Sequence, residues 1–156
     1  MFRGFSQTYV QGKCSKLKIP NKKLDPNYSG DYDLWLDGIK IEVKASRAVD
    51  SDSKEPLYMK ALPRNTDKNF LMNFQQLKPR CCDVFIWVAV FRDQIVLWIM
   101  SSKEVENHKL YQDKHHRGSI GEGQMHIKNT NIQELDIFEL TDDNLEKAIR
   151  DAAKRN

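Results

Sequence analysis

The chain has 156 residues, of which 40% are apolar and 30% charged, and it carries a net charge of +3. This length suits one domain, and the composition is that of a folded protein rather than a disordered one. The longest apolar run, residues 84–91, is far shorter than the roughly 20 residues of a membrane helix. The start of the sequence lacks the basic-then-apolar order of a signal peptide. We therefore expect a single domain over residues 1–156, in the cytoplasm and without membrane association.

The distribution of charge indicates which partners to expect, and the cysteine spacing indicates whether to expect a zinc site. Residues 1–24 form a basic N-terminal segment with six Lys or Arg residues and no acidic residue. Such a segment suits an anionic partner such as DNA or RNA, or it serves only to keep the chain in solution. The three cysteines, Cys14, Cys81 and Cys82, contain no CxxC spacing, so no structural zinc site is expected.

The first half of the chain alternates turn-rich and apolar segments. Residues 1–30 are expected to be irregular or briefly helical, and residues 31–45 to form a hairpin. Residues 46–64 are polar and predict a loop, with a short strand at 57–61. Asn65 or Thr66 has the character of a helix N-cap, and apolar residues at helical spacing predict a helix over 66–78.

The second half predicts two buried strands followed by shorter elements. Residues 84–91 and 95–100 are β-branched and aromatic almost throughout, which is typical of strands buried on both faces. Ser101 and Glu104 match a capping box. The remaining predictions are a loop at 111–123, short strands at 124–128 and 134–140, and a last helix capped by Thr141. Interleaved strands and helices predict an α/β or α+β fold with a mixed central β-sheet flanked by helices.

The dipeptide Asp37-Gly38 is the strongest local signal in the chain. It lies between two alternating runs, residues 32–36 and 39–44, and therefore predicts a hairpin with a two-residue type I′ turn. This loop pairs residue 36 with 39 and so on outward. Asp33 then lies opposite Glu42, with β-carbons roughly 4.5–5.5 Å apart. Lys44 follows two residues later on the same face.

Two carboxylates opposed in this way suggest a metal site. Like charges directly opposite each other destabilise a hairpin, but a divalent cation between them reverses that effect. Mg²⁺ commonly takes one or two carboxylates together with waters and a substrate phosphate, and it can activate a water as nucleophile. The alternative is that these charged residues only form the solvated face of an amphipathic hairpin.

The pattern Asp33 … Glu42-x-Lys44, within GDYDLWLDGIKIEVKAS, resembles the PD-(D/E)XK nuclease superfamily. The order of the later elements is similar to that of small type II restriction endonucleases. The resemblance implies a restriction-endonuclease-like core in which Asp33, Glu42 and Lys44 are catalytic and the two carboxylates bind Mg²⁺. Two departures are visible: Tyr32 stands where many members have proline, and residues 1–30 contain no Glu.

Further candidates lie outside the hairpin. Gln75, beside Gln76 on the polar side of the expected 66–78 helix, is a possible neighbour of the active site, because a helix glutamine approaches it in some members. Basic and imidazole side chains predict DNA contacts, although a solvated loop explains most of them equally well. These candidates are Arg47, Lys114, His115, His116 and Arg117.

The sequence thus predicts a Mg²⁺-dependent, sequence-specific endonuclease that hydrolyses double-stranded DNA, of the type II restriction class. Since one chain offers one site, a homodimer reading a palindromic sequence is the economical arrangement. Two alternatives stay open. One is a nuclease of the same fold without sequence specificity, acting in repair, recombination or as a toxin. The other is a nucleic-acid-binding module without catalysis.

Overall fold

A computed structural model describes residues 2–113 and 122–156, which form a mixed α+β fold with two four-stranded sheets. The first sheet has the order β1 (Leu34–Leu36), β2 (Ile39–Arg47), β5 (Val84–Val90) and β6 (Ile95–Ser101). Its β2–β5 pair is parallel and the other pairs are antiparallel, so the predicted mixed sheet is confirmed. The second sheet, which is antiparallel, has the order β3 (Val49–Asp50), β4 (Phe70–Leu77), β8 (Gly123–Lys128) and β7 (Tyr111–Gln112).

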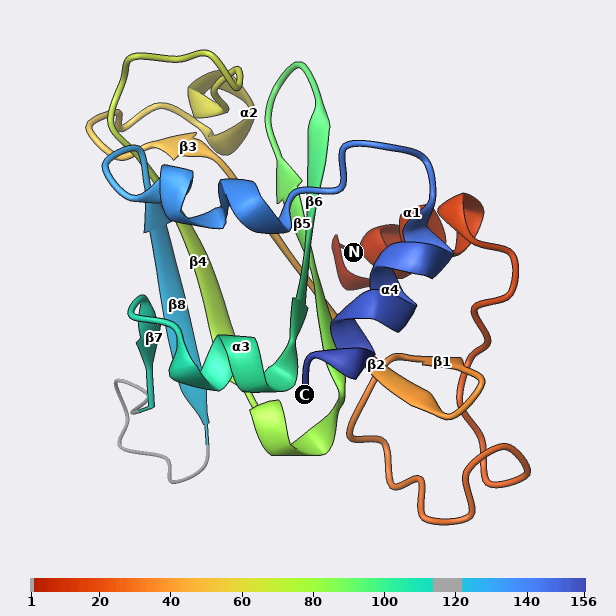
Figure 1. Cartoon of the computed structure of the whole chain (residues 1–156). Helices are drawn as coiled ribbons and strands as arrows, with labels where there is room; N and C mark the ends of the chain where they lie inside the picture. The colour runs from red at the N-terminus through yellow and green to blue at the C-terminus, as the bar shows by residue number, and fades with distance from the viewer. Residues whose placement is uncertain (1, 114–121) are drawn as a thin grey trace.

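The first sheet lies in the middle of the molecule, between two helices and the second sheet (Figure 1). Strand β5 is buried on both faces, as its continuous apolar sequence predicts. Val84, Ile86 and Val88 pack against α1 (Phe2–Lys13) and α4 (Leu145–Lys154). Phe85 and Trp87 belong to the other core layer, between the two sheets. That layer also receives residues of α3 (Ser102–Asn107) and of the 3-10 helix η2 (Ile132–Phe138).

The hairpin around Asp37-Gly38 has the predicted register. Leu34 pairs with Ile41 and Leu36 pairs with Ile39, and both turn residues have positive φ, 47° for Asp37 and 93° for Gly38. Only a turn of this kind matches the twist of the flanking strands with a two-residue loop. The expected hairpin is therefore confirmed.

The predicted helix over 66–78 is wrong, because this segment contains β4. Phe70, Met72 and Phe74 are buried alternately, and a bulge then interrupts the ladder to β8. Gln76 lies within it at φ 56°, which returns Leu77 to the buried face. The extra residue gives Phe70, Phe74 and Leu77 the spacing of a helix, although the segment is a bulged strand.

Three other expectations are also corrected. The strand expected at 57–61 is a single helical turn, α2 (Leu57–Lys60), whose Lys60 N–H donates to the carbonyl of Pro56. The strand expected at 134–140 is η2, whose tight turns leave Ile137 84% exposed. The last helix is capped not by Thr141 but by Asn144, whose side-chain oxygen accepts the Lys147 N–H.

The N-terminal and 111–123 segments contain more regular structure than expected. Helix α1 extends over twelve residues, where the sequence predicts an irregular or briefly helical segment. Tyr111 and Gln112 pair with β8 as strand β7. The capping box at Ser101 and Glu104 is confirmed, with both reciprocal hydrogen bonds present. Among the described residues, no helix combines the length and apolar character needed to cross a membrane.

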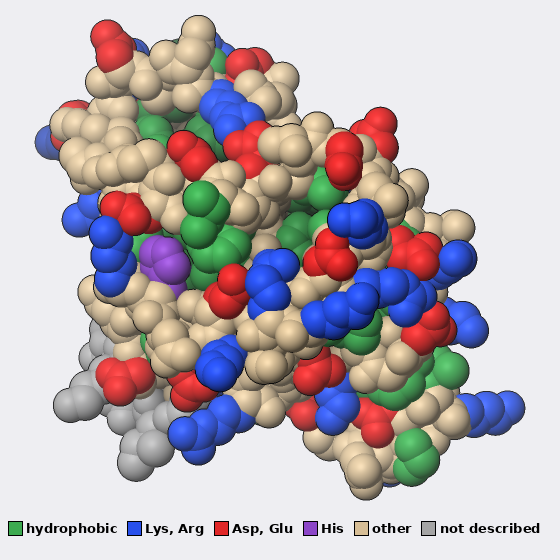
Figure 2. Space-filling view, viewed as in Figure 1, with side chains coloured by type: hydrophobic (Ala, Val, Ile, Leu, Met, Phe, Trp, Pro, Cys, Tyr) green, Lys and Arg blue, Asp and Glu red, His purple; other side chains and the backbone are tan. Residues whose placement is uncertain are grey.

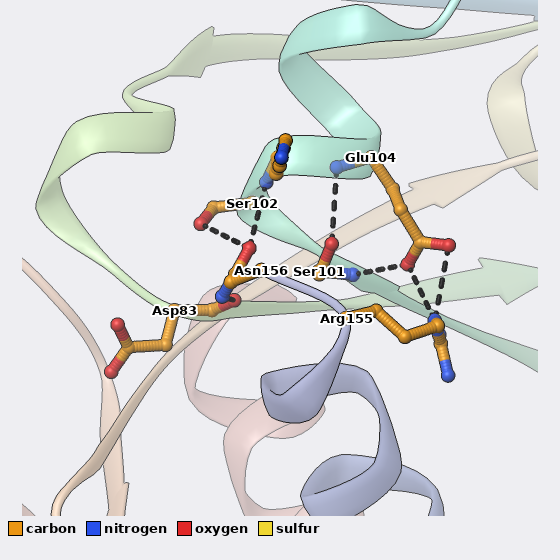
Figure 3. A network of polar contacts seen from close by, with 7 residues as sticks. Asp83, Ser101, Ser102, Glu104, Arg155 and Asn156 are labelled. Atoms are coloured by element: carbon orange, nitrogen blue, oxygen red, sulfur yellow. Dashed lines mark hydrogen bonds and ion pairs between the residues drawn. The ribbon is translucent and has the colours of Figure 1, made fainter.

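Asp83 connects the hairpin to the rest of the molecule. Its carboxylate accepts the Lys40 N–H at 2.9 Å, and its own N–H donates to the Lys40 carbonyl at 2.8 Å. Its carbonyl accepts hydrogen bonds from the Asn156 side chain and from the backbone N–H of Ser102. Beside it, Arg155 binds both carboxylate oxygens of Glu104 (Figure 3). The first strand pair of the sheet is thus held in place by the start of α3 and by the last residues of the chain.

Candidate active site

The carboxylate of Asp33 lies at the edge of β2, beside the backbone of Val43. The Asp33 N–H donates to the Ile41 carbonyl, while its Oδ2 accepts the Val43 N–H, both at 2.9 Å. Strand β1 begins only at Leu34, and the Val43 N–H bonds to the Asp33 side chain instead of to a backbone carbonyl of β1. The predicted opposition to Glu42 therefore differs from a regular cross-strand pair, because Asp33 bonds to the residues on either side of Glu42.

Glu42 and Lys44 project from one face of β2. They pair in register with Phe85 and Trp87 of β5, which belong to the core layer between the sheets. Since side chains alternate along a strand, both lie on the face opposite helices α1 and α4. Each is half-buried. The predicted placement of both residues on one face is thus confirmed, and Val43, which holds Asp33, is the residue between them.

Helix α1 supplies a residue that the sequence analysis missed. Gln7 Nε2 donates to Asp33 Oδ1 at 2.9 Å, so both carboxylate oxygens accept a hydrogen bond. Asp33 is only 6% exposed, and these bonds fix its orientation. No local sequence pattern marks Gln7, but Val10, three residues later on the same helix, is fully buried. A helix that buries Val10 against the hairpin also brings Gln7 towards the sheet.

Aromatic side chains surround the base of the hairpin. Trp35, which the alternation places on the charged face, is half-buried and stacks on Tyr32 with ring centroids 6.5 Å apart. Tyr32 donates a hydrogen bond of 2.7 Å to Asp25, and this bond lowers the pKa of the Asp25 carboxyl. The Lys40 ammonium lies 5.9 Å from the centre of the Tyr32 ring. These contacts give the hairpin a rigid base beneath its charged residues.

Cys82 lies close to Glu42 but is unsuited to nucleophilic catalysis. Burial raises the pKa of its thiol, and the negative charges of Glu42 and Asp83 raise it further. The thiol is therefore protonated at neutral pH, and the thiolate is the reactive form. Cys14 is also a buried free thiol, and Cys81 is partly buried.

The donor set suits a hard cation bound by few protein ligands. Within residues 2–113 and 122–156, no three or more His, Cys, Asp or Glu side chains gather as a metal site. Asp33, which is bonded to the backbone of Val43, and Glu42, the residue before Val43, nevertheless offer two carboxylates. Each carboxylate oxygen has more than one acceptor position, so accepting a hydrogen bond does not by itself prevent it from binding a cation. Oxygen donors in this number fit Mg²⁺, which keeps several waters when it binds to proteins.

The other predicted site residues lie at the end of β2, on β4, or outside the described part of the chain. Arg47 is exposed at the end of β2, three residues beyond Lys44. Gln75 is exposed on strand β4 rather than on a helix. Gln76, its neighbour, occupies the bulge. Four predicted DNA contacts lie outside the described residues: Lys114, His115, His116 and Arg117.

Charges of both signs are mixed on the face that carries α3 and α4 (Figure 2). Many of these side chains form ion pairs with one another. Lys16 of the basic segment pairs with Glu146 at 3.1 Å, and Arg150 pairs with both Asp37 and Glu146. A polyanion such as DNA is attracted by a positively charged surface rather than by ion pairs whose charges neutralise each other. This face is therefore a poor candidate for DNA binding.

The sequence matches no protein-family model and no curated protein.

Proposed function

We propose that this chain is a metal-dependent DNA endonuclease with a restriction-endonuclease-like core. The observation that carries the proposal is the position of Asp33, held by Val43 between Glu42 and Lys44. The carboxylate of Asp33 is thus bonded to the backbone of β2 between the residues that carry a second carboxylate and an ammonium. The resemblance of these three residues to the PD-(D/E)XK pattern supports the same assignment.

Asp33 and Glu42 are the residues that would hold Mg²⁺. When bound, this ion would activate a water and stabilise negative charge on the phosphate that is attacked. Gln7 is a positioning residue, since it acts through the Asp33 carboxylate rather than on the substrate. Because the Asp33 carboxylate is already fixed by two hydrogen bonds, little reorganisation is needed when the cation binds.

Lys44 is the residue that acts on the substrate phosphate. Its ammonium lies on the same face of β2 as Glu42, and hydrolysis places additional negative charge on the phosphoryl oxygens. A cation positioned before the reaction stabilises this charge at no further cost of reorganisation. Lys44 also carries donors able to orient the attacking water.

Double-stranded DNA is the proposed substrate, and the proposed enzyme is a homodimer. The described residues of one chain contain one hairpin of this kind, whereas a break through both DNA strands needs two hydrolytic events. Two copies related by a twofold axis present two equal sites to the two antiparallel strands. The dimer is tested separately by light scattering of the purified protein with and without DNA.

The direct test incubates the purified protein with phage-length duplex DNA in Mg²⁺ and, in parallel, in EDTA. Discrete fragments in Mg²⁺ alone are the expected result for a restriction-type enzyme, and their lengths begin to define the recognition sequence. A continuous smear keeps the nuclease and removes sequence specificity, which favours a repair, recombination or toxin role. Salt-sensitive binding that is never followed by cutting would instead indicate a binding module without catalysis.

A further inference from the structure

A second feature of the molecule is an open groove of about 730 Å³ where the two sheets meet. Its walls come from the end of β2, from β3 and the turn after it, from α2 and from β4. Strand β3 and helix α2 lie together at the top of Figure 1, beside the start of β4. Its lining includes Ser46, Arg47, Lys60, Leu71 and Asn73.

This groove adjoins the candidate active site. Ser46 follows Lys44 by two residues on β2 and pairs in register with Ala89, as Lys44 pairs with Trp87. It therefore lies on the same face of the strand. Its hydroxyl accepts the backbone N–H of Asn73 at 3.1 Å, which joins β2 to β4 at this point. A polymer bound at Lys44 that continues along β2 would enter the groove at Ser46.

The chemistry of the walls suits a nucleotide. Ala45, Val49 and Leu71 give the groove apolar surface, which suits the faces of a base and a sugar. Arg47 and Lys60 add two cations, which suit phosphates. The one carboxylate in the lining, Asp50, accepts the Asp52 N–H in the turn after β3.

Asn73 adds a group able to read a base edge. It is exposed, and its side-chain amide carries both a donor and an acceptor. An Asn amide can pair with adenine at two positions at once, whereas it matches the other bases less well. The hydrogen bond to Ser46 uses only the backbone of Asn73, so the side chain can be changed without breaking it.

We propose that this groove is a DNA subsite for the nucleotides next to the scissile phosphate. This inference rests on the proposed nuclease function and adds a determinant of sequence preference to it. Arg47 and Lys60 hold the phosphates of the strand, and Asn73 contacts the edge of one base, with adenine favoured at that position.

The first part of the test measures affinity, using a fluorescently labelled 20-base-pair duplex in EDTA. Lys60→Gln is compared with Lys154→Gln, an equally conservative change at the exposed end of α4. We expect Lys60→Gln to weaken binding severalfold and to lower the salt slope by about one, since it removes a phosphate contact. The control is expected to match the wild type. Equal affinities and slopes for all three proteins would overturn the assignment of Lys60.

The second part reads base preference from the sequenced ends of fragments cut in Mg²⁺. Wild-type ends should be enriched in adenine at one fixed position near the cut, and Asn73→Ala should lower that enrichment about fivefold or more. Asn65→Ala, an exposed change outside the groove, should leave it unaltered. Unchanged enrichment in Asn73→Ala overturns the subsite but keeps the nuclease. Intact DNA with the wild-type protein overturns the nuclease, and the subsite with it.

Discussion

Substitutions at Asp33 separate its contribution to the stability of the fold from its proposed contribution to cleavage. Asp33→Ala removes the acceptor of the Val43 N–H at a residue only 3% exposed. A buried N–H left without a partner costs about 1–3 kcal/mol, and the lost bond from half-buried Gln7 adds about 1 kcal/mol. We therefore expect a loss of about 2–4 kcal/mol in the free energy of unfolding.

Asp33→Asn is the matched variant. Its side-chain oxygen can still accept the Val43 N–H, so we expect a loss of no more than about 1 kcal/mol. The negative charge is removed, however, so we expect the proposed cation binding to be lost. Asparagine should therefore preserve the fold and abolish cleavage, whereas alanine should impair both.

Urea denaturation without metal, followed by fluorescence of buried Trp87 and Trp98, measures the stabilities of the two variants. Cleavage of duplex DNA in Mg²⁺ is measured under conditions where both remain folded. If Asp33 were only a repulsive partner of Glu42, its replacement by alanine would stabilise the protein. A variant Asp33→Ala as stable as the wild type, or more stable, would refute the reasoning from its hydrogen bonds.

Three further changes test other parts of the fold. A Cβ at Gly123 would overlap the ring of Tyr111, so Gly123→Ala should lower the free energy of unfolding by about 1–3 kcal/mol in urea. The hydrogen bond from Tyr32 lowers the pKa of Asp25, so the free energy of unfolding should fall as the pH drops below 3.8. Asp25→Asn should remove this part of the dependence of stability on acid pH. Burial lowers the pKa of His108, whose Nδ1 accepts a backbone N–H, so the free energy of unfolding should also decline below pH 6.5. If His108→Gln retained this decline in a pH titration, His108 would not be its cause.

The hairpin could be predicted because its information is local. Asp37-Gly38 sets the turn, the turn sets the register, and the register places Glu42 and Lys44 on one face. The buried strands β5 and β6 were likewise predicted from their continuous apolar sequence. These elements need no knowledge of what packs against them.

The second sheet could not be predicted in the same way. The bulge at Gln76 gives β4 the apolar spacing of a helix, and only pairing with β8 decides between the two. Gln7 was missed because its role depends on where α1 packs against the hairpin. Its partner Asp33 is 26 residues away in the sequence, so no local pattern connects them.

The most direct test of the account compares DNA cleavage by the wild type, Glu42→Ala and Lys44→Ala in Mg²⁺, with duplex affinity and unfolding measured on the same samples. The account predicts that the wild type cuts, that both variants fail to cut, and that both remain folded and still bind DNA. Wild-type cutting rates in either variant, or intact DNA with the wild-type protein, would contradict the proposed active site.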